Sequence, residues 1–312
     1  MDGAQLRPLS VGEILDVAIK VYRERFGNLV RAVAIVVGPI ALLTALIQIS
    51  AFSDTDGFSG FDPETDPTTT FDFGDFWAFL AGLLLTALMS FIAGEVATAA
   101  SFKIVSGAYL NAAPDWRDSL RFAVSKLRSL IWLSVLLGLL IGLGLLAFIV
   151  PGAYFWGLWA VAVPALLLED QRGRAALRRS KGLVKGRWWP TVACLVVAAI
   201  LSGIVQSVFS GLLLGVTVSG TNDVVQVVAQ AVATTLGSML TTPFTAAVVT
   251  VLYFDLRVRK EGFDLELLAQ RVGVEPPPPG ARQDLLPPPP PDAGSAQPPF
   301  WPPPPGWRPP DG

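Results

Sequence analysis

The sequence predicts an all-α membrane protein, a polytopic helical bundle with six transmembrane helices and amphipathic helices at the cytoplasmic interface. Hydrophobic residues make up 52% of its 312 residues and charged residues only 15%, and the mean hydropathy is +0.54. Several apolar runs reach about 20 residues, enough to cross a hydrocarbon layer of roughly 30 Å. Lys and Arg fall only in the segments before, between and after these runs, which is typical of a multi-span protein.

The first predicted element is an amphipathic helix at about residues 10–26. Ser10 and Glu13 have the spacing of a capping box, in which each residue satisfies a backbone N–H at the start of a helix. Apolar residues then recur at helical spacing, with charged residues on the opposite face. Such a helix either lies on the membrane surface or packs beneath the bundle, and both placements remain open at this stage.

Six spans are predicted, together with two further amphipathic helices. The spans lie at about 32–52, 76–104, 130–150, 153–168, 190–216 and 227–253, and the further amphipathic helices at about 115–128 and 171–187. Pro151 and Gly152 are expected to form a tight turn between the third and fourth spans. Residues 1–272 therefore form a membrane domain, and residues 263–272 have the pattern of one more short helix.

Residues 273–312 are expected to form a disordered, proline-rich cytoplasmic tail. Its proline runs cannot build a packed core and favour extended polyproline conformations. The tail serves either as a spacer or as a ligand for an aromatic groove on a protein partner.

The distribution of basic residues predicts the orientation of the chain. Segments 1–31, 103–129, 169–189 and 254–312 contain 5, 5, 7 and 6 Lys and Arg, which account for all 23. The loops on the opposite side of the predicted spans contain none. Because Lys and Arg concentrate in cytoplasmic loops, we expect both termini to be cytoplasmic and the protein to be multi-pass in the plasma membrane.

The densest basic segment, residues 169–189, supplies the main candidate binding residues: Arg172, Arg174, Arg178, Arg179, Lys181, Lys185 and Arg187. Three interpretations remain open. The charges only orient the chain, or they attract anionic lipid headgroups at roughly 1 kcal/mol per residue, or they bind a soluble partner or phosphorylated ligand. A nucleic-acid partner is not expected, because no aromatic and basic platform is visible.

Glu95 is the acidic residue that falls inside an apolar run, and intramembrane carboxylates are candidates for handling protons or cations. It is also close enough to the predicted inner interface to pair with a basic residue instead. Two pairs with GxxxG spacing, Gly138 with Gly142 and Gly211 with Gly215, are expected to allow close helix packing inside the bundle.

The three basic amphipathic segments align with one another, each entering a span within a few residues. This pattern suggests three units of one helix and a helical hairpin in the same orientation. The alternative is that any basic amphipathic helix placed before a span would align this well.

Composition argues against most catalytic chemistries. The chain contains no His and one Cys, Cys194, which argues against Ser-His-Asp and Cys-His catalysis, His-ligated metals and a disulfide framework. Gly-rich phosphate loops, HExxH and GxSxG motifs are also absent from the sequence. No catalytic, cofactor-binding or metal-binding residue is therefore predicted, and no cofactor is expected.

Three stretches carry a family resemblance: LRPLSVGEILDVAIKVYRERF at 6–26, VPALLLEDQRGRAALRRSKGLVKGRWWP at 163–190 and LYFDLRVRKEGFDLELL at 252–268. Together they resemble the bacterial glycerophosphoryl diester phosphodiesterase membrane domain family, over about residues 1–272. The resemblance implies a multi-span membrane module. In some members such a module is joined to a soluble TIM-barrel hydrolase that uses His, carboxylates and a divalent metal. This chain has no His and no soluble stretch of about 250 residues for a barrel, so that activity is not expected here.

We therefore expect a non-enzymatic integral membrane module of the bacterial plasma membrane that acts as a scaffold, an accessory subunit or a lipid-interacting element. Its expected partners are anionic lipid headgroups, and a protein partner that binds the membrane domain or the tail. The alternative is a transporter or channel subunit for a small or lipidic solute. That alternative predicts a polar cavity at mid-membrane that reaches Glu95 or the hydroxyl residues of the last span: Thr234, Thr235, Ser238, Thr241 and Thr242.

Overall fold

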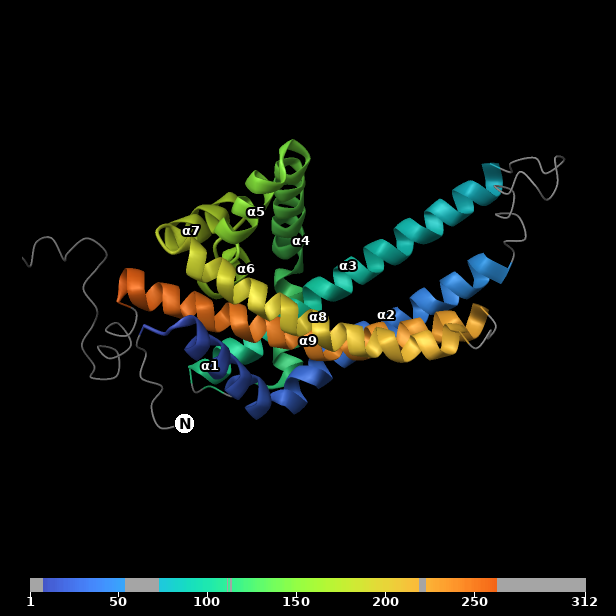
Figure 1. Cartoon of the computed structure of the whole chain (residues 1–312), viewed down its shortest axis with the longest axis horizontal. Coiled ribbons are helices and arrows are strands. Elements are labelled where there is room, and N and C mark those ends of the chain that lie inside the picture. Colours follow the sequence, from blue (N-terminus) through green and yellow to red (C-terminus); the bar gives the residue numbers. More distant parts are fainter. Residues whose placement is uncertain (1–7, 54–72, 111, 113, 219–222, 263–312) are drawn as a thin grey trace, which may run out of the picture. The chain divides into compact units, whose positions relative to one another are not determined.

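The computed structural model of the chain describes residues 8–53, 73–110, 112, 114–218 and 223–262, and all regular structure in those residues is helical (Figure 1). The helices are α1 (Val11–Glu24), α2 (Phe26–Ser53), α3 (Phe73–Tyr109), α4 (Trp116–Ala147), α5 (Ile149–Leu158), α6 (Ala162–Glu169), α7 (Arg174–Val184), α8 (Trp188–Val218) and α9 (Asp223–Glu261). The predicted all-α membrane class is confirmed. The predicted tail at 273–312 and short helix at 263–272 lie outside the described residues.

Within the described residues, six segments are long and apolar enough to cross a membrane, as the sequence predicts. They are Phe26–Ile49, Leu80–Tyr109, Trp116–Ala147, Ile149–Glu169, Trp188–Gly211 and Val224–Glu261. Many apolar side chains on these helices are exposed, including Leu84 (61%) and Leu146 (84%). In a multi-pass protein these faces meet lipid tails, which are as apolar as the side chains themselves.

Helix α9 holds the described part of the chain together. It contacts α1, α2, α3, α6, α7 and α8, and it runs along α8 for much of its length (Figure 1). Residues 246–256 of α9 are buried on every side, which is the pattern of a central helix. Several of them are small or β-branched, and this lets neighbouring helices approach closely.

Helix α1 packs against the bundle. Ser10 Oγ accepts a hydrogen bond from the Glu13 backbone N–H at 3.4 Å, and a Glu13 carboxylate oxygen accepts one from the Ser10 N–H at 2.7 Å, so the predicted capping box is confirmed. Ile14, Ala18 and Val21 form the buried face, and α1 contacts α9 and α8. The sequence left open whether this helix lies on the membrane surface or packs beneath the bundle, and in the structure it packs against the bundle.

The predicted boundary of the second amphipathic helix is wrong. Residues 116–128 and the third span form one continuous helix, α4. Asp115 is its N-cap residue, and the Asp115 carboxylate accepts a hydrogen bond from the Trp116 N–H at 2.8 Å. No helix-breaking residue lies between the two parts, so the backbone continues from the basic segment into the apolar one.

The predicted turn at Pro151 is also misplaced. The chain turns at Phe148, whose backbone is extended (φ −166°, ψ 153°), and Pro151 lies in the first turn of α5. Proline fits that position because a first-turn N–H has no partner within the helix. The fourth span is divided into α5 and α6, with a break at residues 159–161.

Three of the four glycines in these pairs do not pack as expected, and the surroundings of Gly215 lie outside the described residues. A Cβ placed on Gly138, Gly142 or Gly211 would meet no atom within 4 Å. Close approaches occur instead at other glycines, such as Gly144, where a Cβ would lie 3.1 Å from the Gly152 backbone. The spacing of glycines therefore does not identify the packed surfaces of this bundle.

Candidate functional site

An ion-pair network joins α6, α7 and α9, and it consists of Glu169, Arg179, Tyr253, Arg257 and Glu261. Arg179 donates two hydrogen bonds to the Glu169 carboxylate, from Nε at 2.6 Å and from Nη2 at 2.7 Å. It donates two more to the Glu261 carboxylate, from Nη2 at 2.8 Å and from Nη1. Arg257 Nε donates to Glu261 at 3.1 Å and lies 3.7 Å from Glu169. The Tyr253 hydroxyl donates to Glu169. The hydrogen bonds to Glu261 raise the pKa of Arg179 above its ordinary value.

A second ion pair joins α4 to the start of the basic segment. Lys126 Nζ lies 2.6 Å from a carboxylate oxygen of Asp170. Asp170 follows α6 and adopts a left-handed backbone (φ 55°), a conformation that Asp and Asn tolerate better than most residues. The hydrogen bond from Lys126 lowers the pKa of Asp170 below its ordinary value.

Helix α7 has one buried face and one exposed face. Its buried face includes Ala176, Leu183 and Val184, and the Ser180 hydroxyl donates to the Leu158 carbonyl at 2.9 Å. Arg179 projects into the ion-pair network on the packed side. The helix is therefore fixed in rotation about its own axis by apolar packing, one hydrogen bond and the ion pairs.

The exposed face of α7 borders a cavity of about 610 Å³, which we call the α7 groove. Its apolar lining comes from Leu136 and Leu140 of α4, Trp159, and Leu177 of α7. Its basic lining comes from Arg174, Arg178 and Lys181. These three cations are exposed and have no ion-pair partner among the described residues. The α7 groove therefore combines unpaired positive charge with an apolar wall.

The remaining predicted basic residues have different surroundings. Arg172 and Lys185 are exposed and line none of the cavities described here. Arg187 is partly buried and lines a second cavity, of about 420 Å³, between α1, α8 and α9. The structure thus divides the seven predicted cations among one ion-pair network, two cavities and the open surface.

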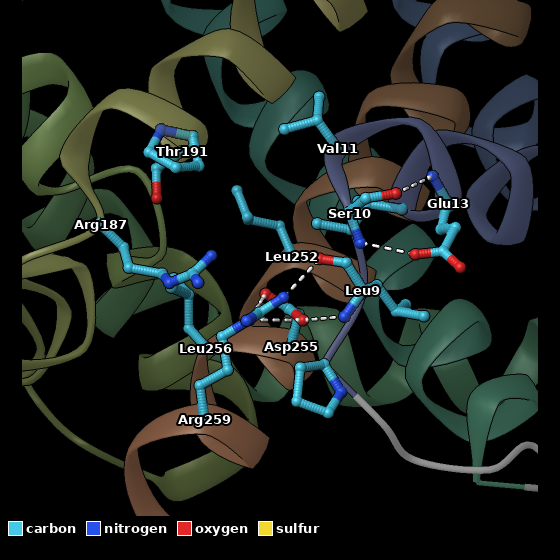
Figure 2. Close-up of a pocket in the computed structure, with 13 residues that line it drawn as sticks. Leu9, Ser10, Val11, Glu13, Arg187, Thr191, Leu252, Asp255, Leu256 and Arg259 are labelled. Carbon is cyan, nitrogen blue, oxygen red and sulfur yellow. Dashed lines mark hydrogen bonds and ion pairs between the residues drawn. The ribbon is translucent and has the colours of Figure 1, made fainter.

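We call the second cavity the α1 joint (Figure 2). Asp255, only 3% exposed, accepts a hydrogen bond from the Leu9 N–H at 2.7 Å and pairs with Arg259 Nε at 2.8 and 3.0 Å. Arg259 also donates to the Leu9 carbonyl at 2.6 Å. Figure 2 shows these bonds as dashed lines, with the Arg187 side chain reaching into the same space without one. The segment before α1 is thereby held against α9.

A third cavity, of about 370 Å³, lies between α2, α3 and α9, and we call it the polar cavity. Its polar lining consists of Thr44, Gln48, Ser90, Gln230, Thr234, Thr235, Ser238 and Thr242. The Thr44 Oγ1 atom is buried and has no hydrogen-bond partner in the described part of the chain. Four of the five hydroxyl residues predicted in the last span therefore reach a shared cavity, and Thr241 does not line it.

Glu95 does not line the polar cavity. Its side chain is partly buried and lies near Ser134 of α4. The structure thus places Glu95 between α3 and α4. Of the two possibilities that the sequence offered for a polar cavity, the observed cavity reaches the hydroxyl residues and not Glu95. Among the described residues, no group of three or more His, Cys, Asp or Glu is arranged to hold a metal ion.

Residues 121–274 match the family model described as a domain of unknown function (DUF8558). The match begins within α4 and includes α7, the α7 groove and α9. Neither the curated proteins nor the solved structures contain a match to this chain. The resemblance to the phosphodiesterase membrane domain family stays a prediction.

Sequence reasoning missed the acidic members of the ion-pair network. Glu169 directly follows the predicted fourth span, and Glu261 lies eight residues after the predicted end of the sixth, where both look like ordinary water-exposed residues. One local signal was present, because Arg257 and Glu261 have the i, i+4 spacing of a helical ion pair. The contacts across 10 and 82 residues between Arg179 and its two partners carry no such signal.

Proposed function

We propose that this protein is a non-enzymatic integral membrane module that binds anionic lipid headgroups in the α7 groove. The observation that carries the proposal is the set of three unpaired cations, Arg174, Arg178 and Lys181, along an apolar wall. A phospholipid has the matching form, because its charged headgroup is attached to apolar chains.

The geometry of α7 favours this ligand over a soluble anion. Arg174, Arg178 and Lys181 lie within roughly 60° of one another around the helix at 3.6 residues per turn. A headgroup would contact the cations while its chains lie against Leu136 and Leu140 on the apolar face of α4. Trp159 supplies an amphipathic ring of the kind that favours the level of the headgroups.

The proposed orientation puts the α7 groove at the cytoplasmic leaflet of the plasma membrane, with both termini in the cytoplasm. The support is the confinement of all 23 Lys and Arg to four segments on one side of the predicted spans. Anionic lipids give that leaflet a negative surface potential, which attracts basic segments. In this role the membrane domain acts as a scaffold or accessory element, and a protein partner would bind the membrane domain or the tail.

The test is lipid retention by purified protein. The triple variant Arg174→Gln, Arg178→Gln, Lys181→Gln is compared with wild type by native mass spectrometry and by titration in nanodiscs with and without phosphatidylglycerol. At roughly 1 kcal/mol per basic residue, the variant should bind the anionic lipid about two orders of magnitude more weakly.

The matched control removes the same charge elsewhere: Arg128→Gln, Arg172→Gln, Lys185→Gln. These residues are exposed and lie outside the α7 groove. This control variant should retain as much anionic lipid as the wild type does. Equal loss in both variants would mean that net charge, and not the α7 groove, determines lipid binding.

A second candidate function is transport of a small polar solute, and the polar cavity favours it. Two amides and six hydroxyl residues surround a space between three span helices, and no charged residue lines it. Buried polar groups in a membrane are costly unless they serve packing or a ligand. The expected solute is therefore uncharged and rich in hydrogen-bonding groups.

Cysteine accessibility tests this second function. Ser238→Cys is introduced with Cys194→Ala, and labelling by a charged, membrane-impermeant thiol reagent is measured from each side. Thr250→Cys is the control, because Thr250 is fully buried in α9. A transport pathway predicts labelling at position 238 and none at 250. Labelling at 238 by lipid-soluble reagents alone would count against transport.

A further inference from the structure

We infer that the α1 joint binds a phosphate group between Arg187 and Thr191 at the start of α8. This ligand site is separate from the α7 groove, and it neither requires nor follows from lipid binding there. Two side chains of this cavity, those of Arg187 and Thr191, have no ion-pair or hydrogen-bond partner among the described residues, whereas comparable side chains elsewhere in the protein do (Figure 2).

The first side chain is Thr191. It is fully buried, and its Oγ1 has no hydrogen-bond partner among the described residues. Hydroxyls in helices usually bond to the carbonyl four residues earlier, as Thr250 does to Ala246 at 2.6 Å and Thr241 to Gly237 at 3.0 Å. Thr191 does not, although its backbone N–H bonds to the Arg187 carbonyl at 3.1 Å. Thr191 lines the α1 joint, so its hydroxyl is an unused hydrogen-bonding group at the wall of that cavity.

The second side chain is Arg187. It is partly buried and makes no ion pair with the described residues, whereas Arg179, Arg257 and Arg259 all pair with carboxylates. The backbone bond from Thr191 to Arg187 continues the helical turn, so the two residues have the i, i+4 spacing that places side chains on one face. A guanidinium and a hydroxyl are thereby presented to the same cavity.

The other charged groups of the α1 joint are already engaged. Asp255 is neutralised by Arg259 and by the Leu9 N–H. Glu13 accepts the capping-box bond from Ser10. Arg187 is therefore the cation of the α1 joint that pairs with no carboxylate among the described residues, and the N-terminal end of the 31-residue α8 adds positive potential beside it.

A phosphate group fits this combination of donors. The guanidinium binds phosphate oxygens through two parallel N–H donors, and helix N-termini favour the same anion. The remaining phosphate oxygen can accept from the Thr191 hydroxyl. A cavity of about 420 Å³ has room for the phosphate and for part of the molecule that carries it. That molecule is either a soluble phosphorylated compound or a phospholipid headgroup.

The experiment measures the thermal unfolding midpoint of the full chain by tryptophan fluorescence, at constant ionic strength. One arm titrates inorganic phosphate into protein in phosphatidylcholine nanodiscs. The other compares nanodiscs of phosphatidylcholine alone with nanodiscs that also contain phosphatidic acid. Stabilisation by phosphate in the first arm identifies a soluble phosphate ligand. Stabilisation only in the second arm identifies a lipid phosphate when it persists in the triple variant of the α7 groove, Arg174→Gln, Arg178→Gln, Lys181→Gln.

Three variants assign the effect to the site. Arg187→Gln should weaken phosphate binding about tenfold or more, and Thr191→Val about fivefold, from the loss of a charged and a neutral hydrogen bond. Lys185→Gln removes the same charge two residues away, outside the α1 joint, and should match the wild type. Thr191→Val should fold normally, because it removes a buried polar atom that has no partner, so it decides the test if Arg187→Gln folds poorly.

The inference is overturned if the wild type responds to neither phosphate source, or if Thr191→Val binds as well as the wild type. An equal loss in Lys185→Gln and Arg187→Gln would also overturn it, because general surface charge would then explain the binding. The triple variant of the α7 groove should keep the full response to inorganic phosphate. In nanodiscs with phosphatidic acid it should keep the part of the stabilisation that Arg187→Gln and Thr191→Val lose, which distinguishes failure of this site from failure of the proposed lipid function.

Discussion

Replacing Arg179 with Ala should destabilise the protein more than any single substitution on the exposed face of α7. The Arg179 guanidinium bridges the carboxylates of Glu169 and Glu261, whose side chains are 15% and 28% exposed. Without it, two partly buried negative charges share Arg257 as their remaining cation in the ion-pair network. The loss therefore combines broken hydrogen bonds with unrelieved repulsion.

The magnitude follows from the burial of the network. Removing one partner of a fully buried ion pair costs about 3–5 kcal/mol, whereas an exposed pair contributes about 0–1 kcal/mol. The Arg179 side chain is 27% exposed, so the free energy of unfolding should fall by roughly 2–3 kcal/mol. In a chain of this size, that loss corresponds to a decrease in unfolding midpoint of roughly 4–12 °C.

The assay is thermal unfolding in nanodiscs, followed by tryptophan fluorescence, with Arg178→Ala as the matched control. Arg178 has the same charge and is the adjacent residue, but it faces the α7 groove. Arg179→Ala combined with Glu261→Gln should recover part of the loss, because one of the two repelling charges is gone. If Arg179→Ala and Arg178→Ala differ by less than about 0.5 kcal/mol, the network does not stabilise the fold and this reasoning is refuted.

Two further predictions concern the other ion pairs. Asp170→Asn keeps the left-handed backbone but loses the ion pair with Lys126. That pair lowers the pKa of Asp170 below its ordinary value of 3.8. The stabilisation from the ion pair is therefore complete above pH 3.8 and is lost as the pH falls through the lower pKa of the folded state. Unfolding midpoints of wild type and variant should therefore differ at pH 7 and converge in strong acid, and an equal difference at both pH values would contradict this. Asp255→Asn should cost roughly 2–4 kcal/mol and speed hydrogen exchange at the Leu9 N–H, because it breaks a nearly buried pair with Arg259. Unchanged exchange at Leu9 would show that the start of α1 is held by other contacts.

The sequence predicts those parts of the fold that depend on local pattern. The six spans follow from apolar length, and the capping box of Ser10 and Glu13 follows from residue spacing. Boundaries were less predictable where two patterns meet. The basic residues 115–128 and the apolar run after them are both helical, so nothing in either pattern shows that α4 continues through both. The turn at Phe148 was missed because proline signals a turn and the first turn of a helix equally well.

The candidate sites were only partly predictable, because they depend on contacts between distant segments. The positive-inside rule treats the seven cations of residues 169–189 as equivalent. In the structure Arg179 is bound between two carboxylates, Arg178 borders the α7 groove and Arg187 borders the α1 joint. Those surroundings depend on how α6, α7 and α9 pack. The threefold repeat stays a prediction, although α1 and α7 are separate helices whereas the corresponding segment of α4 is continuous with its span.

The ion-pair network and the α7 groove are linked through the orientation of α7. On a helix with 3.6 residues per turn, Arg179 lies roughly 100–160° from Arg174, Arg178 and Lys181. Holding Arg179 between Glu169 and Glu261 therefore directs the other three cations away from α9 and toward the wall formed by α4. An anchor on one side of a short helix thus sets the direction of the charges on the other. For this reason Arg179→Ala should weaken lipid retention in the α7 groove without touching the lipid, whereas Arg172→Ala, which removes an exposed cation of the same segment, should not.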